Sequence, residues 1–162
     1  MTSTKIELSH NRIRRLADLS DLAEILFPGN RNQQHAFLVV WLALKWAHQH
    51  IVPNLMDAAR EHGVSRRTVE RVRAKMRRLG LIDHVSRFNA SHGYREGWVL
   101  SSRFERSLSL LGEKVAALRD SETGSKEKEL VFLGLAEARR DASTADRAAA
   151  NHNDPIHGGD EI

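Results

Sequence analysis

Apolar residues recur at helical spacing along much of this chain. The first predicted helix covers residues 13–27, and four apolar residues lie near one of its faces: Leu16, Leu19, Ala23 and Leu26. The tripeptide PGN interrupts this pattern, and a second helix is expected over residues 32–51. Its central segment, AFLVVWLALKWA, is apolar nearly all round, which is typical of a helix covered on several sides.

Two shorter helices are predicted from the residues at their ends. Asn54 is a favourable N-cap for the segment LMDAAREH, and Gly63 can end that helix because it lacks a Cβ atom. Ser65 is a favourable N-cap for a helix that runs to Leu79, and Gly80 follows it. Two short helices joined by such a tight turn predict a helix-turn-helix.

The period of the pattern changes after the basic segment. LIDHVSRF and YREGWVLSS are short and contain β-branched and aromatic residues, so they predict a β-hairpin with NASHG as its loop. Helical periodicity returns over residues 102–119 and 126–140, and the fold class is expected to be mainly α with a small β-hairpin. The predicted organisation is an N-terminal arm and helix at 1–30, a DNA-binding domain at 31–101, C-terminal helices at 102–142 and a disordered tail at 143–162.

Positive charge is concentrated in one of the predicted helices. The thirteen residues from Arg66 to Arg78 hold six arginines, one lysine and one glutamate, so they carry +6, whereas all 162 residues carry +4. The rest of the chain therefore sums to −2. A helix with a solvated charged face is the alternative, but here the sign is almost unmixed and neighbours four apart are mostly like-charged. The local basicity indicates a polyanion partner.

The basic helix has a face suited to the DNA major groove. Its apolar stripe is expected to face the core and consists of Val69, Val72, Met76 and Leu79. Arg67 and Arg71 are expected to reach base edges, because arginine can bind guanine through two hydrogen bonds. Arg73 and Lys75, at the sides, are expected to reach phosphates. The candidate DNA-contacting residues are Ser65, Arg66, Arg67, Thr68, Glu70, Arg71, Arg73, Ala74, Lys75 and Arg78 in this segment, with Arg87, His92 and Arg95 in the hairpin.

The run AAREHGVSRRTVERVRAKMRRLGLI and the hairpin after it resemble a winged helix-turn-helix. In that superfamily the recognition helix turns into the next strand through a sequence like MRRLGLI, residues 76–82 here. The resemblance implies that the hairpin is a wing, from Asp83 to Leu100, whose loop can contact DNA. The order of elements also resembles the MarR-type regulators, although the Asp-x-Arg pair usual in their wing is absent from NASHGYREGWVL. A hairpin that only closes the core is the alternative, and both roles can coexist because alternate strand residues face opposite ways.

The helix over residues 102–119 carries a second apolar pattern, with a 4-3-4-3 spacing that is typical of a two-heptad seam. The seam residues are Phe104, Leu108, Leu111, Val115 and Leu118. The seam can pack on the N-terminal helix of the same chain, or it can join two copies. A two-fold dimer is favoured, because it would match a palindromic DNA site.

Several functions are not expected from this sequence. There are no cysteines, which fits a reducing cytoplasm and rules out cysteine-ligated metals. The nine histidines do not fall at metal-ligand spacing, so no metal or other cofactor is expected. No membrane span is expected. No catalytic motif is present, so the chain is predicted not to be an enzyme.

The sequence therefore predicts a sequence-specific double-stranded-DNA-binding protein, acting as a homodimeric transcriptional regulator on the cytoplasmic nucleoid. The alternative is a DNA-binding subunit of a plasmid or phage replication, partition or defence complex, in which the C-terminal helices contact another protein. RNA is a weaker candidate, because the A-form major groove is too narrow for a helix.

Overall fold

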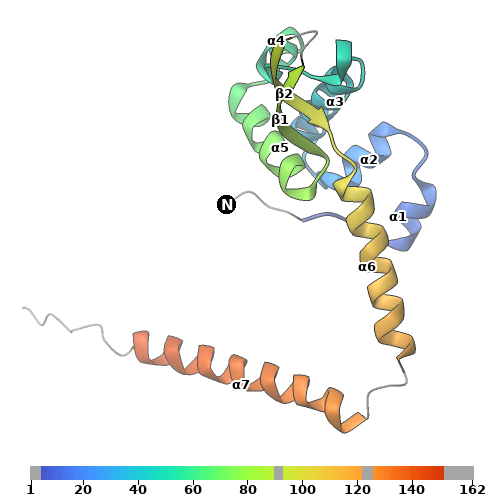
Figure 1. Ribbon diagram of the computed structural model, residues 1–162. Coiled ribbons are helices and arrows are strands. Elements are labelled where there is room, and N and C mark those ends of the chain that lie inside the picture. Colours follow the sequence, from blue (N-terminus) through green and yellow to red (C-terminus); the bar gives the residue numbers. More distant parts are fainter. Residues whose placement is uncertain (1–4, 90–92, 122–125, 152–162) are drawn as a thin grey trace, which may run out of the picture. The chain divides into compact units, whose positions relative to one another are not determined.

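The computed structural model describes residues 5–89, 93–121 and 126–151. The chain divides into two compact units, Met1–Gly112 and Glu113–Ile162. The first unit consists of helices and a two-stranded antiparallel sheet, and the second is helical in the part that is described (Figure 1). The predicted fold class, mainly α with a small β-hairpin, is confirmed.

The segment predicted as one helix over residues 13–27 forms two helices, α1 (His10–Arg15) and α2 (Leu19–Leu26). Asp18 separates them because its backbone is extended and its carboxylate accepts hydrogen bonds from the amides of Ser20 and Asp21, at 2.8 and 3.0 Å. The Asp21 carboxylate bonds back to the Asp18 amide, which completes a capping box. The single long helix was a wrong prediction, because it overlooked this cap.

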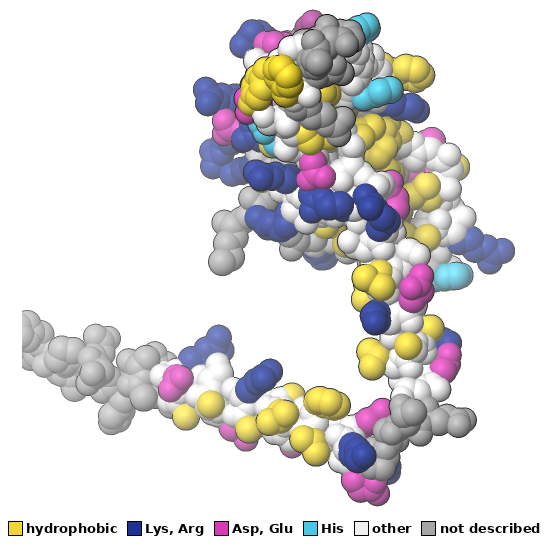
Figure 2. All heavy atoms as spheres, viewed as in Figure 1, with side chains coloured by type: hydrophobic (Ala, Val, Ile, Leu, Met, Phe, Trp, Pro, Cys, Tyr) yellow, Lys and Arg dark blue, Asp and Glu magenta, His cyan; other side chains and the backbone are white. Residues whose placement is uncertain are grey.

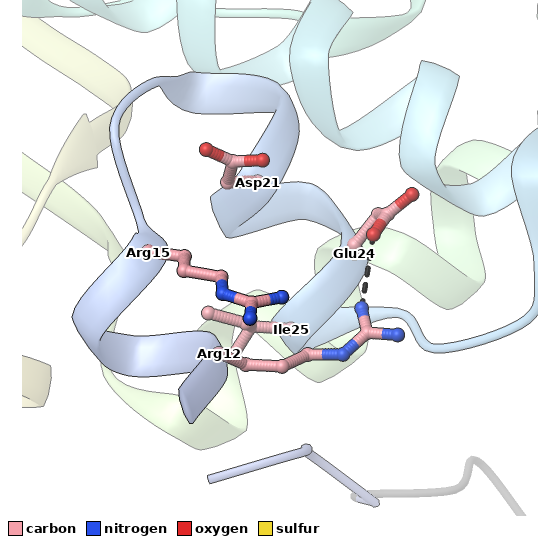
Figure 3. A pocket seen from close by; sticks show the side chains of 5 residues that line it. All are labelled: Arg12, Arg15, Asp21, Glu24 and Ile25. Carbon is pink, nitrogen blue, oxygen red and sulfur yellow. Dashed lines mark hydrogen bonds and ion pairs between the residues drawn. The ribbon is translucent and has the colours of Figure 1, made fainter. Parts of the chain in front are cut away.

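An ion pair helps to hold α1 against α2. The Arg12 guanidinium donates to the Glu24 carboxylate at 2.9 Å (Figure 3). It also lies 3.2 Å from the carboxylate of Glu7. All three side chains are well exposed, so the stabilisation is expected to be small. Burial of Ile25 and Leu26 from α2 contributes more, since apolar burial is the main stabilising term in folding.

Helix α3 (Arg31–Lys45) is the central helix of the first unit. The Asn30 side chain caps it by accepting from the Gln33 amide at 3.0 Å. It ends six residues before the predicted end at residue 51. A short 3-10 turn, η1 (His48–His50), follows and redirects the chain so that Val52 pairs with Trp98 through two backbone hydrogen bonds of 2.8 and 2.9 Å. Strand pairing of a β-branched residue therefore overrides the helical pattern here.

The helix-turn-helix forms as its end signals predict. The Asn54 side chain caps α4 (Leu55–Glu61), and Ser65 caps α5 (Arg66–Leu79) by accepting from the Thr68 amide at 3.3 Å. Gly63 and Gly80 adopt φ angles of 66° and 86°, the left-handed region in which a Cβ atom is unfavourable.

The core lies where α2, α3, α4, α5 and the start of the hairpin meet. Helix α3 packs against α2, α4 and α5. Two of the core aromatic rings, Phe27 and Phe37, lie with their centroids 5.6 Å apart. The core residues that contribute most volume include Leu26, Phe27, Phe37, Val40, Leu44, Val69, Val72, Met76 and Ile82.

The hairpin consists of β1 (Ile82–Asn89) and β2 (Gly93–Leu100), which pair from Ile82↔Leu100 to Asn89↔Gly93. It lies beside α5 in Figure 1. Gly97 is required where Val52 crosses β2, because a Cβ atom there would lie 2.7 Å from the Val52 carbonyl oxygen.

Two helices complete the described chain, α6 (Arg103–Asp120) and α7 (Lys126–Asn151). Helix α7 extends eleven residues beyond the predicted end at Arg140, so a disordered tail from residue 143 is wrong as far as Asn151. Alanine, the best helix former, is frequent in that stretch. Residues 152–162 of the predicted tail lie outside the described residues. Among the described helices, none is long and apolar enough to cross a membrane.

Candidate nucleic-acid interface

Helix α5 has one buried face and one exposed basic face. Val69, Val72 and Met76 are fully buried, as the apolar stripe predicts. Figure 2 shows Lys and Arg side chains gathered on the side of the first unit where α5 lies. The exposed residues of the helix are Arg66, Arg67, Glu70, Arg71, Ala74, Arg77 and Arg78, and we call them the basic face.

One ion pair lies within the basic face. The Arg66 guanidinium donates to the Glu70 carboxylate at 2.8 Å, four residues along the helix. This hydrogen bond raises the pKa of Arg66 and lowers the pKa of Glu70. Among the described residues, Arg67 and Arg71 have no ion-pair partner. Their like charges lie four residues apart, which is unfavourable unless a polyanion binds.

Hydroxyl groups gather at the N-terminus of α5. The Ser65 and Thr68 hydroxyl oxygens are 2.8 Å apart and share a hydrogen bond. Ser65 is exposed and Thr68 is half-buried. The Ser65 side chain already accepts from the Thr68 amide, and the positive end of the helix favours an anion at this place. Phosphate contact by Ser65 and Thr68 stays a prediction.

Lys75 does not lie on the basic face, and its predicted contact with phosphates is wrong. Its residue is only 4% exposed, and its Nζ donates to the Lys5 carbonyl oxygen at 2.7 Å. The ammonium also lies 4.7 Å from the centroid of the Phe27 ring. Burial lowers the pKa of Lys75. Its position borders the apolar stripe, and the flexible four-carbon stem turns inward to fix the N-terminal arm.

Arg73 is half-buried against the hairpin. Its guanidinium carbon lies 5.2 Å from the centroid of the Trp98 ring, a cation–π contact. The other side of this cluster is His84, whose ring centroid is 4.9 Å from that of Trp98. Arg73 therefore positions the hairpin beside α5, and a phosphate contact can use only the part of the guanidinium that remains exposed.

A hollow of about 640 Å³ lies at the C-terminal end of the basic face. Its lining residues are Ala74, Arg77, Arg78, Asp83 and Arg103. Arg103 forms two hydrogen bonds with the Asp83 carboxylate, which hold the pKa of Asp83 down and raise that of Arg103. Three arginines against one aspartate leave this hollow with net positive charge.

Sequence reasoning left Arg77 and Arg103 out of the candidate site. Arg77 belongs to the basic run, and the helical period already places it near the outward face of the helix. No local sequence pattern predicts that Arg103 lines the hollow, because Arg103 lies there only after the hairpin brings the chain back to the end of α5. That return brings the Phe104 amide within 3.0 Å of the Gly80 carbonyl oxygen.

The structure describes only some of the hairpin residues that are predicted to contact DNA. Arg95 lies on β2 and is half-exposed, directly opposite Arg87 of β1 in the strand register. The side chain of Arg87 lies outside the described part of the structure. His92 also lies outside the described residues. DNA contact by these three residues stays a prediction.

The predicted seam of α6 divides into a buried end and an exposed remainder. Phe104 packs against the core of the first unit, so the core already covers part of it. Leu108, Leu111, Val115 and Leu118 are exposed, between 37% and 76%. Figure 2 shows apolar side chains along α6.

Comparisons of the chain with protein-family models, with curated proteins and with solved structures found no match. In the described part of the chain, no three histidine, cysteine, aspartate or glutamate residues gather to hold a metal ion.

Proposed function

We propose that this chain binds double-stranded DNA sequence-specifically through α5 and acts as a homodimeric transcriptional regulator. The observation that carries the proposal is the basic face of α5. It presents Arg67 and Arg71 without ion-pair partners among the described residues, on a helix whose opposite face is locked into the core. A rigid helix with outward guanidinium groups fits the major groove, where such groups can distinguish guanine.

The supporting residues around α5 suit phosphate contacts. The hollow lined by Arg77, Arg78 and Arg103 is open and basic, and the Ser65 hydroxyl lies at the other end of the helix. Phosphate contacts at both ends of a recognition helix would fix its register on the duplex.

The homodimer is supported by the exposed seam of α6. Leu108, Leu111, Val115 and Leu118 share one face of the helix and remain uncovered among the described residues. Covering such leucine and valine side chains is favourable by roughly 25 cal/mol for each Å² removed from water. A two-fold dimer would also place two copies of α5 for two half-sites.

A second candidate function is a DNA-binding subunit of a nucleoprotein complex for replication, partition or defence. Helix α7 favours this candidate, because it exposes a second apolar cluster of Leu130, Val131, Phe132, Leu133 and Leu135. A homodimer joined by α6 alone would leave that cluster uncovered, so a further protein could bind there.

Selection from a library of random-sequence duplexes tests the proposed function. We expect the full chain to enrich a palindromic motif. The variant with Arg67→Ala and Arg71→Ala should enrich none, and Arg119→Ala on α6 should enrich the same motif as the natural chain. Retained DNA without any shared motif would contradict sequence-specific binding. Enrichment of a single, non-repeated half-site would favour the second candidate.

A further inference from the structure

The hollow at the C-terminal end of the basic face is lined by residues of two helices and one strand. Three of them, Ala74, Arg77 and Arg78, belong to the basic face itself, so the hollow continues the surface that is proposed to bind DNA. Asp83 comes from β1, and Arg103 is the first residue of α6. A ligand that binds at this end of α5 therefore also meets Asp83 and Arg103.

Arg103 has a fixed backbone and an exposed side chain. The Phe104 amide donates to the Gly80 carbonyl oxygen at 3.0 Å. A Cβ atom on Gly80 would lie 2.9 Å from the Cβ atom of Arg103, so the start of α6 packs directly on the glycine that ends α5. The Arg103 side chain, by contrast, is 51% exposed. The guanidinium can therefore change its partner without any movement of the helix.

The partner of Arg103 in the free protein is Asp83. The guanidinium donates from Nε to one carboxylate oxygen at 3.1 Å and from Nη2 to the other. The hydrogen bond from Arg103 holds the pKa of Asp83 below its ordinary value, so the carboxylate stays charged at neutral pH. An ion pair as exposed as this one contributes little stability, because water solvates both charges. Another anion can therefore displace Asp83 at low cost.

The charge of the hollow favours such an anion. Because Asp83 and Arg103 neutralise each other, Arg77 and Arg78 leave the hollow with a net positive charge. Arginine binds phosphate through two parallel hydrogen bonds, the same geometry in which it binds a carboxylate. A duplex whose major groove holds α5 would place backbone phosphates beside that helix.

We propose that Arg103 exchanges partners when the protein binds DNA, from Asp83 in the free protein to a backbone phosphate in the complex. This proposal rests on the proposed function, because α5 would bring the phosphate to the hollow. Asp83 then competes with DNA for Arg103 and lowers the affinity for every duplex, since phosphates carry no sequence information. Asp83 thereby limits how tightly the chain holds duplexes that α5 does not read.

A second arginine–aspartate pair in the chain provides matched controls. Arg119 and Asp120, at the end of α6, are also joined by two hydrogen bonds, of 2.7 and 2.9 Å, and both are exposed. Asp83→Asn and Asp120→Asn make the same change of charge in two similar pairs, and so do Arg103→Ala and Arg119→Ala. Fluorescence anisotropy of each full-length variant, on a selected and a scrambled duplex, measures the affinities. Potassium chloride without phosphate buffer leaves the duplex as the source of phosphate.

The two members of the proposed exchange should have opposite effects. Asp83→Asn should bind both duplexes about three- to fivefold more tightly than the natural chain, because the competing charge is lost. Arg103→Ala should bind both more weakly, and the slope of log K against log salt should become shallower by about 0.9, the contribution of one phosphate. Asp120→Asn and Arg119→Ala should stay close to the natural chain in affinity and slope, since their pair lies outside the basic face.

A measurement on the natural chain does not depend on the folding of any variant. The Nε–H resonance of Arg103, assigned by NMR in the free protein, should shift when the duplex is added, because Nε changes its acceptor. A resonance that keeps its free position in the complex would overturn the exchange.

The other failures are distinguishable. Equal gains in affinity for Asp83→Asn and Asp120→Asn would overturn the exchange and leave the proposed function standing. An Arg103→Ala slope equal to that of Arg119→Ala would do the same. Failure of the natural chain to bind either duplex would overturn the proposed function itself, and the exchange of partners with it.

Discussion

Two basic side chains of α5, those of Lys75 and Arg73, have structural roles. Both belong to the run that makes α5 basic, yet Lys75 fixes the N-terminal arm and Arg73 packs on Trp98. A helical projection places each residue by angle alone and does not account for the length of the side chain. A long stem can turn its charge inward where a carbonyl oxygen and an aromatic ring receive it.

Substitution of Lys75 should therefore change stability and not DNA affinity. Lys75→Ala should lower the free energy of unfolding by about 1–3 kcal/mol, because the Lys5 carbonyl oxygen loses its donor and a gap opens beside Phe27. Lys114→Ala, at an exposed site on α6, should change it by less than about 0.5 kcal/mol. Urea denaturation measures both. A shallower salt dependence of DNA binding in Lys75→Ala would contradict the assignment of Lys75 to the interior.

The burial of Lys75 should also make the free energy of unfolding depend on pH in the alkaline range. Burial lowers the pKa of Lys75 in the folded chain below its value in the unfolded chain. Between these two values the unfolded chain binds more protons, so stability rises with pH. The cost of burying the charged form is fully present below the folded pKa. Lys75→Met lacks this group, so the stability difference between the natural chain and Lys75→Met should shift in favour of the natural chain as pH rises. A difference that is constant across alkaline pH would argue against it.

At the scale of elements, the sequence predicted what local signals determine. The caps at Asn54 and Ser65 and the turns at Gly63 and Gly80 form as expected, because each depends on atoms within a few residues. The early end of α3 was missed, because it depends on pairing of Val52 with Trp98, 46 residues away in sequence. The Arg103–Asp83 pair in the candidate site was missed for the same reason. The break at Asp18 is local and could have been predicted from its capping box.

The seam of α6 predicts a change in oligomeric state. Leu111→Asp should place a charge in the interface between two copies and reduce the mass measured by light scattering to that of one chain. Ser109→Asp is the matched control, since residue 109 lies about 200° around the helix from residue 111 and is exposed. A mass that is unchanged in Leu111→Asp, or reduced equally in both variants, would exclude this seam as the dimer contact.

At the scale of the whole molecule, the charge of the chain is unevenly distributed. The segment from Arg66 to Arg78 carries +6 and the rest of the chain sums to −2, so the net positive charge of the chain comes from this segment. Such an arrangement favours one orientation of the protein on DNA, since the field is strongest at α5.

Binding should therefore depend steeply on salt. Each phosphate contact is expected to contribute about −0.9 to the slope of log K against log salt concentration. A dimer with several contacts from each copy should have a slope several times larger than that. Titrations of one duplex at increasing potassium chloride concentration measure it. A slope near zero would show that phosphate neutralisation does not drive binding.

The most direct test of the central claim is whether α5 reads bases. Anisotropy titrations would compare the natural chain with Arg71→Ala on the selected duplex and on a scrambled duplex. The account predicts a loss of about 1–3 kcal/mol on the selected duplex, which corresponds to about five- to 150-fold, and a much smaller loss on the scrambled one. Neither folding nor dimer mass should change, because Arg71 lies on the exposed face of α5. Equal losses on both duplexes would contradict base reading through Arg71, and the protein would then be a non-specific DNA binder.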